Sequence, residues 1–255
     1  MTNNAHHSAN STYNYNPDEC DISQKHIIKG RDYILNSLLN TPAASHNIIV
    51  YPDIRILRRT YPVYIKSLLD NNQIALVLTY YDHPSIIRQA VAYDENNNDS
   101  SMVLERHIRD RSLVMLDSVM SHEPQHNDER INKLNFLSLI RIMLNHGIKN
   151  NKNGVNIFLD MGVFFHFGYC HSKNYNIVQN ILEYEKSIPV KYRELEFKTF
   201  CLYHQRDYES HFRSTRQRAQ LFRCHEHSVV VLENNNDRSN NINDNNNLIE
   251  ETAQV

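Results

Sequence analysis

The amino-acid sequence predicts a three-layer α/β domain with a mostly parallel central sheet of about six strands, covered by helices on both faces. Three observations support this prediction: short apolar runs recur along the chain, helical patterns fill the gaps, and the runs are almost continuously hydrophobic. Strands buried on both faces have this composition, because each face packs against helices. Regular alternation of strand and helix favours right-handed crossovers and parallel pairing.

Six segments rich in β-branched and aromatic residues are predicted to form the strands. They are Asn47–Tyr51, Ile74–Tyr81, Ser112–Asp117, Val155–Met161, Phe197–Tyr203 and Ser228–Leu232. Helices are expected at 23–40, Arg58–Asn71, Pro84–Tyr93, Asp128–His146, Asn174–Lys186 and Asp207–His225. The helix that begins at Pro84 carries proline in its first turn, where the missing N–H has no helical partner to lose.

The chain divides into one folded domain and two polar ends. Residues 1–22 are rich in Asn, Ser and His, and residues 234–255 contain Asn runs, so both ends are predicted to be disordered. The length of the region between them, residues 23–233, suits a single domain with its own hydrophobic core.

The composition favours a cytoplasmic protein. The net charge of −2 argues against a surface built to hold nucleic acid, because such domains usually carry a basic excess. No segment reaches the roughly 18–20 consecutive apolar residues of a membrane span, and the polar N-terminus has no secretory pattern. The four cysteines lack the spacing of a disulfide framework, so reduced thiols are expected. No membrane partner is expected, and the sequence allows a homo-oligomer.

The residues after the first predicted strand cannot form a phosphate-binding loop. Such a loop needs glycines, whose backbone N–H groups wrap the phosphates, followed by Lys and Ser or Thr. The segment Pro52–Arg59 reads PDIRILRR, and the five glycines of the chain form neither GxxxxGK[ST] nor GxGxxG. No catalytic constellation is recognisable. We therefore expect a protein that is not an enzyme and that needs no cofactor.

Polar and aromatic residues gather where the predicted strands end. In a parallel sheet the carboxyl ends of the strands meet at one edge, and ligands bind in the crevice there. We expect a pocket with tyrosine walls and a few directed hydrogen bonds, although residues such as Asp82 and Asp207 could instead cap helices. The ligand-binding candidates at strand ends are Tyr51, Asp53, Arg55, Tyr81, Asp82, Asp117, Asp160, Tyr203 and His204.

Six short motifs follow one another in a set order between His46 and Leu232. They are HNIIVY at His46–Tyr51, YIKSLLDNNQ at Tyr64–Gln73, LDMG at Leu159–Gly162, the pair Tyr184-Glu185, FCLY at Phe200–Tyr203, and His227. In this order they resemble the MEDS domain, a sensory domain described from methanogens and methylotrophs and related to KaiC-type RecA-like ATPases. The resemblance implies a RecA-like sandwich, a sensory role without ATPase activity, and His46 and Glu185 as further ligand-binding candidates. In two places the chain departs from the family: Asn replaces the usual Gly near Asn71, and Asp160 stands where Glu is common.

Structural roles are open for the residues that carry the resemblance. Glu185 could accept hydrogen bonds from a neighbouring loop or pair with an arginine. Cys201, in a central strand, is most simply a small buried hydrophobe, because the sequence shows no base to activate it. His46 and His227 could likewise be structural histidines with satisfied hydrogen bonds.

Two further kinds of site match local patterns but are not expected. The clusters Cys170-His171, Cys201-x-x-His204 and Cys224-His225-x-His227 lack the paired spacings of structural zinc sites, so no metal site is predicted. Arginines within 206–223 could contact phosphates, although a solvated outer helix is the simpler interpretation. Nucleic acid is therefore not an expected partner of this domain alone.

The sequence thus predicts a non-catalytic sensory or signal-transduction domain. It would bind a small molecule or a signalling protein at the strand-end cleft and regulate a downstream protein by a population shift. An enzyme that uses the same cleft is the first alternative. A nucleic-acid-binding adaptor that acts through the arginine-rich segment 206–223 is the second.

Overall fold

The computed structural model describes most of the chain between residues 20 and 232. The described ranges are 20–92, 100–119, 133–166, 176–188, 195–232 and 249–250. The strands are β1 (Ser45–Tyr51), β2 (Gln73–Thr79), β3 (Leu113–Asp117), β4 (Gly154–Asp160), β5 (Glu196–His204), β6 (His227–Leu232) and β7 (Ile249–Glu250). The helices are α1 (Cys20–Asn40), α2 (Ile54–Asp70), α3 (Pro84–Ala92), α4 (Ser100–Arg109), α6 (Lys133–Lys149), α7 (Gly162–His166), α8 (Ile177–Ser187), α9 (Gln205–His211) and α10 (Thr215–Phe222).

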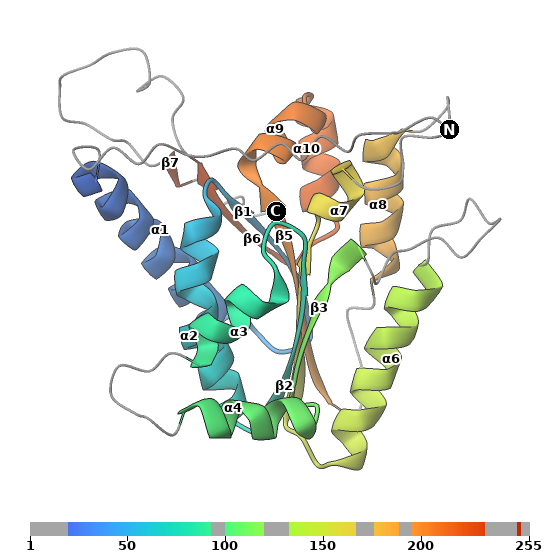
Figure 1. Ribbon diagram of the computed structural model, residues 1–255. Helices are drawn as coiled ribbons and strands as arrows, with labels where there is room; N and C mark the ends of the chain where they lie inside the picture. The colour runs from blue at the N-terminus through green and yellow to red at the C-terminus, as the bar shows by residue number, and fades with distance from the viewer. Residues whose placement is uncertain are drawn as a thin grey trace, which may run out of the picture.

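The strands form one sheet in the order β3-β2-β4-β5-β1-β6-β7 (Figure 1). All pairs from β3 to β6 are parallel, and β7 pairs antiparallel with β6. Each of the six predicted strands coincides with an observed one to within about two residues at either end. The order differs from the Rossmann order 3-2-1-4-5-6, because β1 here lies between β5 and β6.

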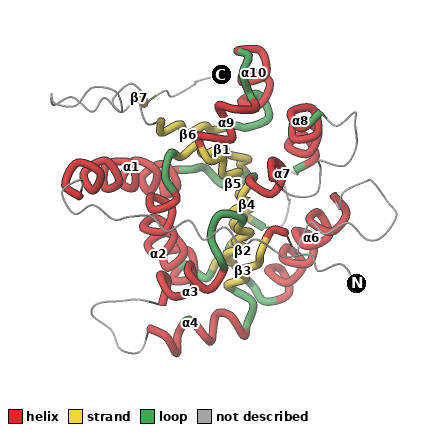
Figure 2. Tube along the Cα trace, turned by 45° about the horizontal axis from the view of Figure 1, so that its top comes forward, coloured by secondary structure: helices red, strands yellow, loops and turns green. Residues whose placement is uncertain are grey.

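Helices cover both faces of the sheet, and the predicted three-layer α/β sandwich is confirmed (Figure 2). Helices α1, α2, α3 and α4 lie on one face, and α6, α7, α8 and α10 lie on the other (Figure 1). Side chains alternate along each strand, so Ile48 and Val50 of β1 enter one apolar core while Ile49 and Tyr51 enter the other. Burial on both faces explains why the strands are nearly continuous in hydrophobicity.

Local differences from the sequence-based expectation have identifiable causes. The single helix expected at Asp207–His225 is two helices, because Ser214 caps α10 in a capping box with Gln217. Helix α2 begins at Ile54, four residues earlier than expected, because Asp53 caps it. Helices α4 and α7 had not been predicted.

Parts of the predicted ends lie outside the described residues. Helix α1 begins at Cys20, and residues 1–19 are not described. In the predicted tail, the described residues are the two of β7. Residues 128–132 and 174–175, expected to begin two helices, are also outside the described part of the chain. Among the described residues, no helix combines the length and the apolar character needed to cross a membrane.

Candidate functional site

The connection from β1 to α2 is a two-residue turn made of Pro52 and Asp53. The Asp53 side chain accepts a hydrogen bond from the backbone N–H of Arg55 at 2.8 Å and caps α2. Arg55 also donates from its guanidinium to the same carboxylate, with Nε at 2.8 Å. Although burial raises the pKa of Asp53, these bonds from Arg55 outweigh it and lower the pKa. A carboxylate thus lies at the helix N-terminus, the position where a phosphate-binding loop would hold its phosphate.

A hydrogen-bonded group of Tyr81, His166 and Asp207 lies at the carboxyl ends of the strands, and we call it the strand-end cluster. Tyr81 follows β2, His166 ends α7, and Asp207 lies in the first turn of α9. The Tyr81 hydroxyl donates to Asp207 Oδ2 and lies 3.0 Å from His166 Nε2, which is 2.9 Å from Asp207 Oδ1. The Asp207 side chain is 4% exposed, whereas that of His166 is 44% exposed. Three separate elements therefore meet at one buried carboxylate with a histidine open to solvent.

Two further candidate residues, Tyr51 and His204, line this cluster. They are partners in the β1–β5 register, and their rings meet edge to face with centroids 5.4 Å apart. His204 also lies 5.2 Å from the Tyr81 ring and caps α9 through Nδ1, so the cap is His204 rather than Asp207. Burial lowers the pKa of His204, which favours its neutral form. The Tyr51 hydroxyl is buried and makes no hydrogen bond to any described residue.

Asp160, at the end of β4, fixes the loop that carries Tyr81. Its Oδ2 accepts from the backbone N–H groups of Tyr80 and Tyr81, both at 3.0 Å, and its Oδ1 accepts from Gly162 at 2.9 Å. Burial raises the pKa of Asp160 to about 6, against the opposing effect of these three N–H donors. Asp160 therefore positions Tyr81, and its own oxygens already have protein partners.

Asp82 and Asp117 make contacts outside the group of Tyr81, His166 and Asp207. Asp82, expected as a helix cap or pocket residue, instead forms a two-pronged ion pair with Arg58 of α2, with Nε–Oδ1 and Nε–Oδ2 distances of 2.9 and 3.0 Å. This pair ties α2 to the start of α3. Asp117 ends the edge strand β3 and accepts from the backbone N–H of Val119 at 2.8 Å.

A second polar group is enclosed between the sheet and the layer of α8 and α10, and we call it the buried carboxylate cluster. It consists of His46 on β1, Glu185 on α8, Cys201 on β5, and His225 in the turn before β6. Glu185 Oε2 lies 3.0 Å from His46 Nε2, 3.3 Å from His225 Nε2 and 3.1 Å from Cys201 Sγ. The Tyr203 hydroxyl donates to the other oxygen, Oε1. All five side chains are buried.

The neighbouring groups in this cluster shift the pKa values of Glu185 and Cys201. Burial alone would raise the pKa of Glu185, but the neighbouring histidines His225 and His46 hold it well below its usual range. Burial and the adjacent Glu185 raise the pKa of the Cys201 thiol well above its usual value. A lone buried Cys201 is thus a thiol rather than a nucleophilic thiolate.

The structure separates candidates that the sequence had grouped together. Tyr51, Tyr81 and His204 meet at the strand ends, whereas His46, Glu185 and Tyr203 belong to the buried carboxylate cluster. Three residues of these two clusters were not among the sequence-predicted candidates: His166, Asp207 and His225. His225 had a signal, since it lies in a cysteine–histidine pair. His166 had none, because the short helix α7 was not predicted.

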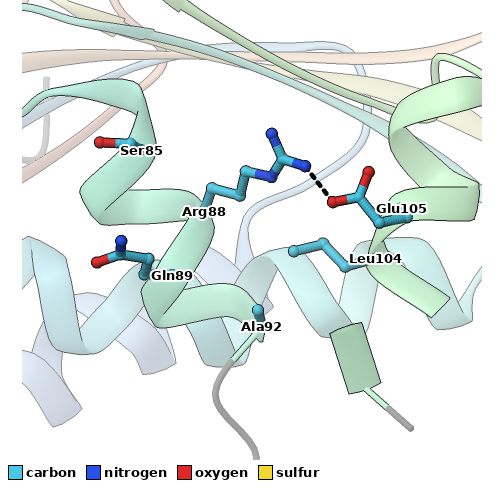
Figure 3. A pocket seen from close by; sticks show the side chains of 6 residues that line it. All are labelled: Ser85, Arg88, Gln89, Ala92, Leu104 and Glu105. Atoms are coloured by element: carbon cyan, nitrogen blue, oxygen red, sulfur yellow. Dashed lines mark hydrogen bonds and ion pairs between the residues drawn. The ribbon is translucent and has the colours of Figure 1, made fainter. Parts of the chain in front are cut away.

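Two surface cavities lie at the far edge of the sheet, near α3 and α4. The first measures about 310 Å³ and is lined by Ser85, Arg88, Gln89, Ala92, Leu104 and Glu105 (Figure 3). Arg88 reaches across it from α3 to pair with Glu105 of α4, and both side chains are half exposed. The second measures about 460 Å³ and extends beside β3 to Met143 of α6. None of the sequence-predicted candidate residues is among the described residues that line these two cavities.

Comparisons with known proteins found similar folds but no matching family. No protein-family model matches the chain, and no curated protein matches it. A solved structure of the uncharacterized protein PH0321 from Pyrococcus horikoshii, in complex with an unknown peptide, is similar at 12% identity and a TM-score of 0.53. The match covers 79% of this chain and 83% of that one. A prototypical ATPase from the type III secretion system of pathogenic bacteria matches at 9% identity and a TM-score of 0.42, over 81% of this chain and 56% of its own.

Proposed function

We propose that this chain is a regulatory, sensory domain that binds a small polar ligand or a partner protein at the strand-end cluster and hydrolyses no nucleotide. The observation that supports this most directly is the junction of Tyr81, His166 and Asp207, with the half-exposed His166 at its surface. Three separate elements share one carboxylate. A ligand that competes for Asp207 would change how they pack.

The turn between β1 and α2 supports the absence of nucleotide hydrolysis. A phosphate at the N-terminus of α2 would meet the Asp53 carboxylate, which already accepts the Arg55 N–H. The negative charges of the phosphate and of the Asp53 carboxylate would repel each other. Arg55 could not offset this repulsion freely, because its guanidinium is already paired with Asp53. The missing glycines remove the backbone flexibility that a phosphate loop also requires.

The contacts of the strand-end cluster suggest how a signal would travel. Asp207 lies in α9, His166 ends α7, and the loop of Tyr81 is held by Asp160 of β4. A ligand that binds better to one arrangement of α7 and α9 shifts the population toward it. A downstream protein could read the altered surface of these helices. The motif order that resembles the MEDS sensory domain agrees with this role.

The ligand class follows from the groups available. The rings of Tyr81 and His204 offer apolar faces, and His166 and Asp207 offer a donor and an acceptor. This combination suits a small polar molecule with an apolar body. A peptide is a second class to include, because the similar protein PH0321 was solved with one.

One contact favours an enzyme as the alternative. His166 Nε2 lies 2.9 Å from the buried Asp207, and such a carboxylate can orient a histidine for proton transfer. Turnover of a bound ligand that disappears in His166→Gln, while binding persists, would favour the enzyme over the sensor.

The test is a thermal-shift screen of the full chain against metabolites, nucleotides and a peptide library, with mass spectrometry of co-purifying compounds. A ligand at about 100 times its Kd stabilises a fold by about 2.7 kcal/mol, a melting-temperature rise of about 5–10 °C. We expect Mg-ATP to produce no shift. The shift caused by a true ligand should be lost in Tyr81→Phe and His166→Gln and kept in His227→Gln, a matched change at an exposed histidine.

Two outcomes would contradict the proposal. A well-folded protein that no compound or peptide stabilises would argue against a ligand-binding domain. A shift caused by Mg-ATP with release of phosphate would show that the chain is an ATPase despite its sequence.

A further inference from the structure

The four side chains of the buried carboxylate cluster have the geometry of metal ligands. The ligating atoms of His46, Glu185, Cys201 and His225 all lie within 4.8 Å of one another. Four of the pair distances, including that from His46 Nε2 to Cys201 Sγ, fall between 3.0 and 3.3 Å. Zinc bonds of about 2.0–2.3 Å place tetrahedral ligand atoms roughly 3.3–3.7 Å apart. The four measured distances are slightly shorter than these, so the ligand atoms need to move apart by only a few tenths of an ångström to admit an ion.

The hydrogen bonding of His225 points its other nitrogen at the same centre. Its Nδ1 lies 2.9 Å from the carbonyl oxygen of Leu221, and a carbonyl has no hydrogen to give. Nδ1 must therefore carry the hydrogen, which leaves the Nε2 lone pair of the neutral ring directed toward Glu185. Nε2 is buried and makes no hydrogen bond to any described residue. Two lone pairs facing each other at 3.3 Å need a cation or a proton between them.

The same crowding affects the other ligands. The His46 nitrogen, the His225 nitrogen and the Cys201 sulfur all approach the single oxygen Oε2 of Glu185. The centroids of the two histidine rings lie only 4.2 Å apart, so positive charges on both rings would repel each other. A divalent cation with one thiolate, one carboxylate and two neutral imidazoles has a net charge of zero. That balance is what a fully buried site requires.

The surrounding contacts are those that orient metal ligands. The Leu221 carbonyl fixes the tautomer of His225, and the Tyr203 hydroxyl holds the free oxygen of Glu185. Such outer contacts typically change metal affinity by about 10–100-fold when removed. They come from α10 and β5, elements that the metal itself would join to α8 and β1.

We infer that His46, Glu185, Cys201 and His225 form a four-ligand Zn²⁺ site that fastens α8 and the α10–β6 turn to the central sheet. Nitrogen, sulfur and carboxylate ligands together suit zinc. With four protein ligands the site has no open position for substrate, so its metal is structural or regulatory rather than catalytic. The inference does not depend on the strand-end proposal, because it uses different residues.

The test measures metal in the untagged full chain, purified without chelator. We expect about one zinc per chain by elemental mass spectrometry. Replacement by Co²⁺ should give the visible bands of a tetrahedral ion and the near-ultraviolet charge-transfer band of a cobalt–thiolate bond. Removing the metal should lower the melting temperature by about 5–10 °C, reversibly on adding zinc.

Matched variants locate the metal. Cys201→Ser should abolish the thiolate band and weaken zinc binding at least about tenfold, and Glu185→Gln should weaken binding similarly. Cys224→Ser is the control, because Cys224 is a second thiol near the cluster that donates to the Gln220 carbonyl instead. It should keep both the zinc and the band. If Cys201→Ser fails to fold, survival of the cobalt–thiolate band in a triple variant, Cys20→Ser with Cys170→Ser and Cys224→Ser, still assigns the ligand, because Cys201 is then the last cysteine of the chain.

Two results would overturn the inference. A folded wild-type chain without zinc, without a cobalt spectrum and without a zinc-dependent melting temperature would show the cluster to be a proton-sharing network. A metal that remains after Cys201→Ser and leaves after Cys224→Ser would show that the site lies elsewhere.

Discussion

Replacing Gly162 with alanine is expected to destabilise the fold and to displace the strand-end cluster. Gly162 is the first residue of α7 and lies against the loop after β2. A Cβ atom at this position would lie 2.6 Å from Cδ1 of Tyr80 and 2.7 Å from Cε2 of Tyr81. It would also lie 3.1 Å from Oδ1 of Asp160, which binds the Gly162 N–H.

The size of the effect follows from these contacts. Ordinary carbon contacts begin near 3.5 Å, so the added atom overlaps each ring by roughly 0.8 Å. Tyrosine rings are rigid, and Tyr81 is held by its hydroxyl bonds to Asp207 and His166. Overpacking of this kind typically costs about 1–3 kcal/mol. For a chain of this length, that lowers the melting temperature by about 3–10 °C.

The same substitution at Gly30 is the matched control. A Cβ there would meet Cδ1 of Ile56 at 2.9 Å, the tip of a flexible side chain that can turn away. Gly30 lies within α1, where alanine is favoured over glycine by about 0.5–1 kcal/mol. Gly30→Ala should therefore be neutral or stabilising, whereas Gly162→Ala should destabilise.

Urea and thermal denaturation of both variants, with near-ultraviolet circular dichroism of the tyrosines, would measure the difference. A Gly162→Ala protein as stable as the wild type, with an unchanged tyrosine signal, would refute the packing described around α7. So would a Gly30→Ala protein that is the less stable of the two.

Three further outcomes are expected from denaturation experiments. The raised pKa of Asp160, about 6, means that its contribution to stability is complete below about pH 4 and is lost as the pH rises through 6. Wild type should therefore lose up to about 3 kcal/mol relative to Asp160→Asn over this range, and parallel pH profiles would contradict the burial of the group. Ala44 has a φ of 57°, so Ala44→Gly should stabilise by about 0.5–1 kcal/mol in urea, and a loss would count against that backbone conformation. Asp53→Ala should cost about 1 kcal/mol by removing the cap of α2, whereas Arg55→Ala, which keeps the cap, should cost less than about 0.5 kcal/mol.

The strands could be predicted from the sequence because their signal is local. A strand buried on both faces, such as Gly154–Asp160, is apolar at most of its positions, Asn156 and the terminal Asp160 excepted, and that composition is visible without knowledge of the neighbours. The order of the strands is not local. Nothing in the segment Ser45–Tyr51 indicates that it pairs with Glu196–His204 on one side and His227–Leu232 on the other. That choice depends on contacts between residues far apart in the sequence.

The site could be predicted only in part, for a related reason. The sequence indicates which residues follow a strand, but not which face of the sheet receives each side chain once a boundary is uncertain by one residue. His46 lies near the amino end of β1, whereas Tyr51 lies at its carboxyl end. The order of the motifs along the chain does not reveal that His46 contacts Glu185 and lies in a different cluster from Tyr51. His166 and Asp207 lie on short helices whose boundaries the apolar periodicity does not define.

The consecutive residues Tyr203 and His204 connect the two clusters. Because side chains alternate along β5, the Tyr203 hydroxyl reaches Glu185 in the buried carboxylate cluster, while the His204 ring faces Tyr51 and Tyr81 at the strand ends. Helix α9 begins at the next residue and carries Asp207. A change in the position of Glu185 would therefore act on β5, the strand that leads into α9 and the strand-end cluster. Since β5 pairs with β1 and β4 on its two sides, this strand has little freedom to absorb such a change, and we expect any displacement to reach α9, the helix that follows it.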